Sequence, residues 1–151
     1  MKTPLRVYAD TSVFGGCFDK EFDDESRAFF DRVSSGVFVL LISDLTVREL
    51  ENAPGEVREF YSTLTGYESV SETNECYGLR DAYLNAGVVG TSSAADALHV
   101  AIATVYRADI IVSWNFKHIV QRRRIHGFEA VNTLMDYRPP EIFSPREIIE
   151  A

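Results

Sequence analysis

The stretch at residues 93–113, SAADALHVAIATVYRADIIVS, decides the fold. Its first part predicts a helix from Ser93 to Tyr106, because apolar residues share one helical face: Ala94, Ala97, Leu98, Ala101, Ile102 and Val105. The run from Ile110 to Ser113 is rich in β-branched residues, which is typical of a strand covered on both faces. A strand of this kind belongs to a parallel sheet between two layers of helices.

Strands and helices alternate along the rest of the chain in the same way. Further strands are expected at residues 5–9, 37–42, 68–70 and 130–134. Helices are expected at residues 24–35, 44–52 (with Ser43 as N-cap), 54–64, 72–85 and 117–126, while Gly15 and Gly16 indicate a loop. The order predicts a single α/β domain over residues 1–151, with a core of about residues 5–135. Three prolines make residues 136–151 an irregular tail, with a short helix after Pro145 at most.

The composition is that of a soluble globular protein. Its 151 residues fit one domain, and a hydrophobic content of 46% excludes a disordered chain. The apolar runs are far shorter than the ~20 residues that span a bilayer, and no signal-peptide pattern opens the chain. Cys17 and Cys76 form no metal-binding spacing, so we expect free thiols in the cytoplasm.

The charge is negative overall and unevenly distributed. The chain has 15 basic and 23 acidic residues, a net charge of −8, which disfavours sequence-independent binding to nucleic-acid phosphates. Residues 107–124 nevertheless hold a basic strip that faces only Asp109: Arg107, Lys117, Arg122, Arg123 and Arg124. This strip is either a solvated helix face or a surface that binds phosphates.

Four polar residues follow the predicted strands or lie in the helices after them: Asp10, Glu49, Asp96 and Asn115. In an open parallel sheet, the site lies outside the carboxyl ends of the strands, so we expect these four side chains to meet there. Carboxylate and carbonyl oxygens are the ligands that Mg²⁺ and Mn²⁺ prefer. The sequence therefore predicts a divalent-cation site at this edge of the sheet.

Each of these residues also has a purely structural interpretation. Asp10 can close an Asx turn, and Asn115 can shape the turn after its strand. Glu49 can be a solvated charge on a helix. Asp96 stands three residues after Ser93, which is the spacing of a helix capping box.

The histidines are weaker signals. His99 lies one helical turn after Asp96, and it either bonds to that carboxylate, contacts a substrate or has no role. His118 and His126 are expected at the surface. A serine-hydrolase elbow, a P-loop and a dinucleotide-binding glycine motif are missing, which disfavours acyl transfer, NTP hydrolysis and dinucleotide binding.

Four segments together resemble the successive motifs of PIN domains: residues 9–13 (ADTSV), 45–50 (LTVREL), 96–103 (DALHVAIA) and 111–116 (IVSWNF). The resemblance extends from about Arg6 to Leu134, and residues 113–118 (SWNFKH) resemble a subgroup of these domains. It implies a three-layer α/β/α PIN-like fold with a central parallel sheet. Proteins of this family are usually dimeric and cut RNA with Mg²⁺ or Mn²⁺. Many prokaryotic members are toxins of toxin–antitoxin modules, of the VapC type.

The resemblance also implies roles for the matching residues. Asp10, Glu49 and Asp96 match the three core acids; Asp10 and Asp96 would hold the metal directly, and Glu49 would bind it through water or position the nucleophile. Ser12, or Thr11, matches the small hydroxyl residue that assists the site.

Asn115 stands where many PIN domains have a fourth aspartate. It brings no negative charge, so we expect a weaker affinity for a second metal ion. Lys117 and the three arginines at 122–124 are expected to hold the flanking phosphates of the RNA.

Three functions remain open from the sequence. The first is a metal-dependent endoribonuclease, with Mg²⁺ or Mn²⁺ as cofactor, RNA as substrate, a small antitoxin as partner, a homodimeric state and no membrane association. The second is a PIN-like module that has lost catalysis and binds RNA or a protein. The third is an unrelated metal-dependent phosphohydrolase that acts on a small nucleotide.

Overall fold

The structure, a computed structural model, describes residues 3–150, and its centre is a five-stranded parallel sheet. The strands are β1 (Leu5–Ala9), β2 (Phe38–Ser43), β3 (Glu68–Val70), β4 (Ile110–Val112) and β5 (Glu141–Phe143). Their spatial order is β3-β2-β1-β4-β5, so the sheet grows from β1 first to one side and then to the other. The direction of winding therefore changes between β1 and β4.

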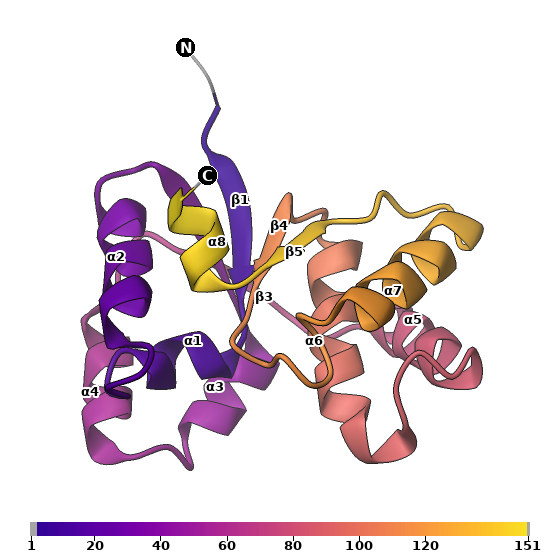
Figure 1. The fold of residues 1–151 in the computed structure, drawn as a ribbon, viewed down its shortest axis with the longest axis horizontal. Helices are drawn as coiled ribbons and strands as arrows, with labels where there is room; N and C mark the ends of the chain where they lie inside the picture. The colour runs from indigo at the N-terminus through magenta and orange to yellow at the C-terminus, as the bar shows by residue number, and fades with distance from the viewer. Residues whose placement is uncertain (1–2, 151) are drawn as a thin grey trace.

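Helices cover both faces of this sheet. They are α1 (Thr11–Gly16), α2 (Asp23–Ser34), α3 (Asp44–Leu50), α4 (Gly55–Thr63), α5 (Asn74–Asn85), α6 (Ala94–Val105), α7 (Arg122–Leu134) and α8 (Pro145–Glu150), with a 3-10 turn η1 (Thr91–Ser93) before α6. Helices α1, α2, α4 and α8 lie on one side of the sheet, and α5, α6 and α7 lie on the other (Figure 1). The three-layer α/β/α architecture expected from the sequence is confirmed.

The central strands alternate their side chains between two buried cores. In β1, Val7 and Ala9 pack on the side of α1 and α2, while Tyr8 packs on the side of α6. In β4, Ile110 and Val112 share the first core and Ile111 the second. Because both faces are covered, residues 7–9, 38–42 and 110–112 of the central strands are continuous apolar runs, as in other parallel sheets.

The strand predicted at residues 130–134 is wrong, and so are the bounds of the helix predicted at 117–126. Helix α7 starts only at Arg122, after Gln121 has capped it through Arg124 N, and then continues to Leu134. Phe128 and Val131 are buried three residues apart on one helical face. The short β-branched run was therefore part of a helical pattern that begins further upstream.

The tail was not irregular throughout, because residues 141–150 extend the sheet and its covering layer. Glu141–Phe143 pair in parallel with β4 as an edge strand, directly after two prolines. Prolines are tolerated there because an edge strand leaves one side unpaired. The short helix expected after Pro145 is α8, which packs against α2.

The loop expected at Gly15-Gly16 is instead the end of helix α1. Gly16 is buried against Ser26 and Trp114, and a β-carbon at this position would collide with both side chains. The glycine thus serves close packing of α1 against α2 and the segment after β4, rather than a turn. Gly15, by contrast, has open space around its α-carbon.

Two further expectations concern the cysteines and the membrane. Both cysteines are free and buried. Within residues 3–150, no helix has the length and apolar character needed to cross a membrane.

The adjacent glycines of α1 give a matched test of this packing. We expect Gly16→Ala to destabilise the protein by about 1–3 kcal/mol, because the added methyl group overpacks the contact with Trp114. Gly15→Ala adds the same methyl group in open space and should stabilise the helix by up to about 1 kcal/mol. Urea denaturation of the two variants measures the difference, and equal effects would contradict the close packing of Gly16.

Candidate functional site

Asp10 lies at the carboxyl end of β1, where the winding of the sheet reverses. Its side chain is 4% exposed and accepts three hydrogen bonds. Oδ1 accepts from the backbone N of Ser12 (3.1 Å) and from its Oγ (2.5 Å), and Oδ2 accepts from Oγ of Ser113 (2.6 Å). The Asx-turn interpretation is thus correct, since Asp10 caps α1, but the same carboxylate also joins β1 to the end of β4.

Glu49 lies on α3, the helix after β2, and it is not a solvated charge. Its Oε1 accepts hydrogen bonds from Oγ1 of Thr11 (2.5 Å) and from Nε2 of His99 (2.7 Å). Its Oε2 has no hydrogen-bond partner among the described residues. Thr11, expected as a helper of the site, is therefore a direct partner of this carboxylate.

Asp96 lies in the first turn of α6, and the capping-box interpretation is wrong. Ser93 makes no side-chain cap hydrogen bond, and its backbone N donates to Gly90 instead. Asp96 uses its Oδ1 to accept a hydrogen bond from Nδ2 of Asn115 (3.1 Å). This acid is therefore free of the helix terminus and faces the segment that follows β4.

Asn115 orients Asp96 through its amide nitrogen. Its Oδ1 accepts hydrogen bonds from the backbone N atoms of Lys117 (3.2 Å) and His118 (3.0 Å), which fixes which way the amide points. The oxygen is therefore occupied by its own loop, and the Nδ2 atom donates to Asp96. An aspartate in this place could not donate that hydrogen bond.

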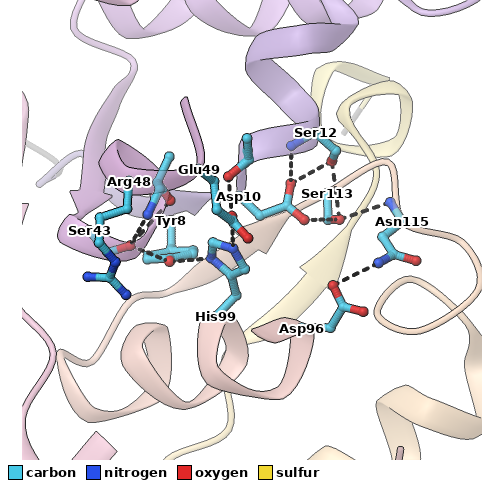
Figure 2. A network of polar contacts seen from close by, with 12 residues as sticks. Tyr8, Asp10, Ser12, Ser43, Arg48, Glu49, Asp96, His99, Ser113 and Asn115 are labelled. Atoms are coloured by element: carbon cyan, nitrogen blue, oxygen red, sulfur yellow. Dashed lines mark hydrogen bonds and ion pairs between the residues drawn. The ribbon is translucent and has the colours of Figure 1, made fainter. Parts of the chain in front are cut away.

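These contacts form two chains of hydrogen bonds that meet at one edge of the sheet (Figure 2). The first runs from Ser12 through Asp10, Ser113 and Asn115 to Asp96. The second runs from Thr11 and Glu49 through His99 to Tyr8 and Ser43. The structure thus brings together all four residues that the sequence placed after its strands.

Burial and mutual repulsion shape the pKa values of the three acids. Burial raises the pKa of Asp10, and the nearby Asp96 carboxylate raises it further, against the influence of His99 and the hydroxyl groups. Burial also raises the pKa of Asp96, with Glu49 adding to the shift and the two histidines His99 and His118 opposing it. The carboxylates therefore lie close enough for the charge of Asp96 to act on Asp10 and the charge of Glu49 to act on Asp96.

Glu49 shifts in the opposite direction. Burial alone would raise its pKa, but the hydrogen bonds from His99 and Thr11 outweigh burial, and the pKa is lowered. Glu49 is therefore a carboxylate at neutral pH and only accepts hydrogen bonds. Burial raises the pKa of the Tyr8 phenol, so its hydroxyl keeps its proton.

His99 bonds to Glu49 rather than to Asp96, and it is only 2% exposed. His126 is exposed as expected, but His118 is half-buried near Asp96. Its Nδ1 atom is buried without a hydrogen-bond partner in the described part of the chain. Sequence reasoning missed Tyr8, Ser113 and His118 as residues of the site. A tyrosine in an apolar strand, two residues before Asp10, was the available signal for Tyr8.

The basic strip is divided by the structure. Lys117, Arg122 and Arg123 are exposed. Arg124 is half-buried, and its Nη1 donates a hydrogen bond to the backbone oxygen of Val88 (2.5 Å), which fixes the connection between α5 and α6. Of the three arginines, only the first two are available to a ligand.

The donor chemistry of the site fits Mg²⁺ or Mn²⁺, because its carboxylate oxygens can accept a hydrogen bond and still offer a second lone pair. Among residues 3–150, no group of three or more Asp, Glu, His or Cys side chains is placed to hold a metal. Both oxygens of Asp10 accept hydrogen bonds, so they would bind a cation through their remaining lone pairs.

The fold and the site define a three-layer α/β/α protein with an acidic site at the switch point of its sheet. Two solved structures share this fold: VapBC2 from Rickettsia felis, bound to a DNA fragment from its promoter, and FitAcB from Neisseria gonorrhoeae. The first has 13% sequence identity and a TM-score of 0.59, and the second has 15% identity and a TM-score of 0.56. Each alignment covers 93% of this chain and 98% of the other. No protein-family model and no curated protein matches the sequence.

The raised pKa of Asp96 predicts a stability effect with a defined sign. A pKa raised by folding means that ionised Asp96 costs stability at neutral pH, and that the cost disappears below its value in the unfolded chain, about 4. We therefore expect Asp96→Asn to raise the melting temperature of the metal-free protein at neutral pH, with no gain in acid.

Glu72 provides a control of opposite sign. The hydrogen bond from Arg48 lowers the pKa of this carboxyl group, so it contributes stability above about pH 4 and loses it in acid. Glu72→Gln should therefore lower the melting temperature at neutral pH. A lower melting temperature for Asp96→Asn as well would contradict the repulsion among the site carboxylates.

Proposed function

We propose that this protein is a PIN-type endoribonuclease that depends on Mg²⁺ or Mn²⁺, and that it is the toxin of a toxin–antitoxin module. The observation that carries this proposal is the convergence of Asp10, Glu49 and Asp96 at the switch point of the sheet. Ligands of open parallel sheets bind at this point. Two of the three carboxylates are held there with raised pKa values, which a cation would relieve.

The residues of the site divide the work in the proposed reaction. Asp10 and Asp96 would hold the metal directly, and Ser12 and Ser113 fix the orientation of Asp10. Oε2 of Glu49 has no hydrogen-bond partner within residues 3–150, and it would hold a water molecule against the scissile phosphate. A bound divalent cation supplies Lewis acidity toward water and compensates charge on the leaving oxygen.

RNA binding by an acidic protein requires local positive charge. Lys117 follows Asn115 directly, and Arg122 and Arg123 open α7 at the end of the same connection. We propose that these three exposed side chains hold the phosphates that flank the cleaved bond. Arg124 does not take this role, because its guanidinium group donates a hydrogen bond to the backbone oxygen of Val88.

The comparisons support the toxin part of the proposal. VapBC2 carries the name of the VapC type that the sequence motifs resemble, and it aligns over almost the whole chain. We propose that an antitoxin binds over the acidic site and excludes substrate from it. We also propose that the active form is a homodimer and that the protein works in the cytoplasm.

Asn115 favours a second candidate function, a module that binds RNA or protein with little or no catalysis. Its oxygen is occupied by the loop, so it adds neither charge nor a ligand to the site. A site with three acids holds a second metal ion less strongly than a site with four.

Cleavage of a mixed RNA pool separates the two candidates. The nuclease predicts fragments with Mg²⁺ or Mn²⁺, none with EDTA, and a fall to background in Asp96→Asn, because that change removes a metal-binding charge. Asp81→Asn makes the same chemical change on the exposed side of α5 and should cleave like the wild type. Metal-supported cleavage that persists in Asp96→Asn would contradict the proposal, and RNA binding without cleavage would favour the second candidate.

The basic side chains are tested by the salt dependence of the reaction. Replacing Arg122 and Arg123 together with Gln should raise KM and leave kcat nearly unchanged. Each phosphate contact on a single strand contributes about 0.7 to the slope of log affinity against log salt, so the slope should fall by about 1.4. Arg58→Gln, an exposed change on α4, serves as the control. An unchanged slope in the double variant would exclude these phosphate contacts.

A further inference from the structure

A chain of hydrogen bonds leads from the buried residues Ser43, Tyr8 and His99 to Glu49. The hydroxyl of Tyr8 is 2.8 Å from Oγ of Ser43 and 2.6 Å from Nδ1 of His99. Nε2 of His99 is 2.7 Å from Oε1 of Glu49. Ser43 in turn caps α3, the helix that carries Glu49, by accepting a hydrogen bond from the backbone N of Thr46 (3.1 Å). Figure 2 shows this chain of hydrogen bonds running from Ser43 through Tyr8 and His99 to Glu49.

With His99 neutral, the chemistry of the partners fixes the direction of each hydrogen bond. The Glu49 carboxylate only accepts, so Nε2 of His99 carries a proton and donates it. A neutral imidazole then has an acceptor at Nδ1, and the Tyr8 hydroxyl donates to it. The Tyr8 oxygen remains free to accept from Ser43, whose own oxygen accepts from Thr46. Every donor in this chain of hydrogen bonds then has an acceptor.

The same chain of hydrogen bonds connects the three elements that carry the acids. Tyr8 lies on β1, two residues before Asp10. His99 lies on α6, three residues after Asp96. Ser43 begins the helix on which Glu49 lies. Buried polar groups that serve packing alone need one hydrogen-bond partner each, from any element. Here the partners come from β1, α3 and α6, the three elements that carry the acids.

We propose that Tyr8 is a positioning residue of the site, which holds His99 in its Nε2–H tautomer so that the imidazole fixes Oε1 of Glu49 and leaves Oε2 for the reaction. The part of this inference that leaves Oε2 for the reaction rests on the proposed function. The tautomer of His99 does not depend on catalysis. Tyr8 and His99 are 0% and 2% exposed, so neither reaches substrate directly.

The tautomer is measured directly by ¹H–¹⁵N correlation NMR of the histidine rings in the metal-free protein. The chain has three histidines, and a His99→Gln spectrum assigns the signal of His99 by its loss. We expect Nε2 protonated and Nδ1 unprotonated in the wild type, and loss of this single state in Tyr8→Phe. A protonated Nδ1 in the wild type, or an unchanged His99 pattern in Tyr8→Phe, would overturn the proposal.

Tyr83 offers a matched control for the removal of a buried hydroxyl. It is also 0% exposed, and its hydroxyl donates to Oδ1 of Asn132 (2.5 Å), away from the acids. Tyr8→Phe should weaken Mn²⁺ binding, measured by calorimetry, by about 10–100-fold, as changes behind metal-binding residues commonly do. Tyr83→Phe should lower stability without changing Mn²⁺ binding. Equal Mn²⁺ affinities in the wild type and both variants would contradict the positioning role.

A conservative rescue distinguishes positioning from packing or proton transfer by His99. A glutamine amide offers one donor and one acceptor, as a neutral imidazole does, while leucine offers neither. We expect His99→Gln to retain much more Mn²⁺ binding and RNA cleavage than His99→Leu. Equal losses in the two variants would overturn the positioning role.

The two proposals can fail separately. If the wild-type protein cleaves no RNA with either metal, the proposed function fails, and the NMR measurement still decides whether Tyr8 sets the tautomer of His99. If cleavage is found but the tautomer is independent of Tyr8, only the positioning role fails.

Discussion

The carboxylate of Asp10 is the point on which the arrangement of the site depends. It is buried between β1 and β4, where it accepts hydrogen bonds from Ser12 and Ser113. Through Ser12 it begins α1, and through Ser113 it fixes the end of β4 from which Asn115 reaches Asp96. A buried charge needs such hydrogen bonds, because an unpaired carboxylate in the interior is strongly unfavourable.

The site also concentrates charge at a cost to stability. Burial raises the pKa of both Asp10 and Asp96, and a neighbouring carboxylate adds to each shift, Asp96 for Asp10 and Glu49 for Asp96. The hydrogen bonds to Asp10 and Asp96 come from neutral donors, the serine hydroxyl groups and the amide of Asn115, while His99 and His118 oppose the rise in pKa. Neutral donors hold these two acids in place without adding positive charge, which suits a site that binds a cation.

Much of the fold could be predicted from the sequence because its elements carry strong local patterns. Helix α6 and strand β4 are long or continuous apolar runs, and all four polar residues placed at the carboxyl ends of the strands do meet there. The failures lie where tertiary packing decides. Position 16 needs a glycine because Trp114 and Ser26 pack where a β-carbon would lie, and not because the chain turns there. Strand β5 has three residues, and its only sequence signal is a pair of apolar residues after two prolines.

The roles of individual side chains were harder to predict than their positions. The amide of Asn115 could have pointed either way, and only the backbone N atoms of Lys117 and His118 fix it. His99 has Asp96 on its own helix one turn away, yet it bonds to Glu49 on another helix, a contact that no local spacing indicates. Long-range partners of this kind follow from the topology of the sheet and not from the pattern of one segment.

The central claim is that Asp10, Glu49 and Asp96 form one divalent-cation site at the switch point of the sheet. Anomalous diffraction from crystals soaked in Mn²⁺ tests it most directly, because it locates the ion without relying on a substrate. The account predicts an anomalous peak in contact with the carboxylates of Asp10 and Asp96. Absence of a peak between these carboxylates at saturating Mn²⁺, or a peak only elsewhere on the protein, would contradict it.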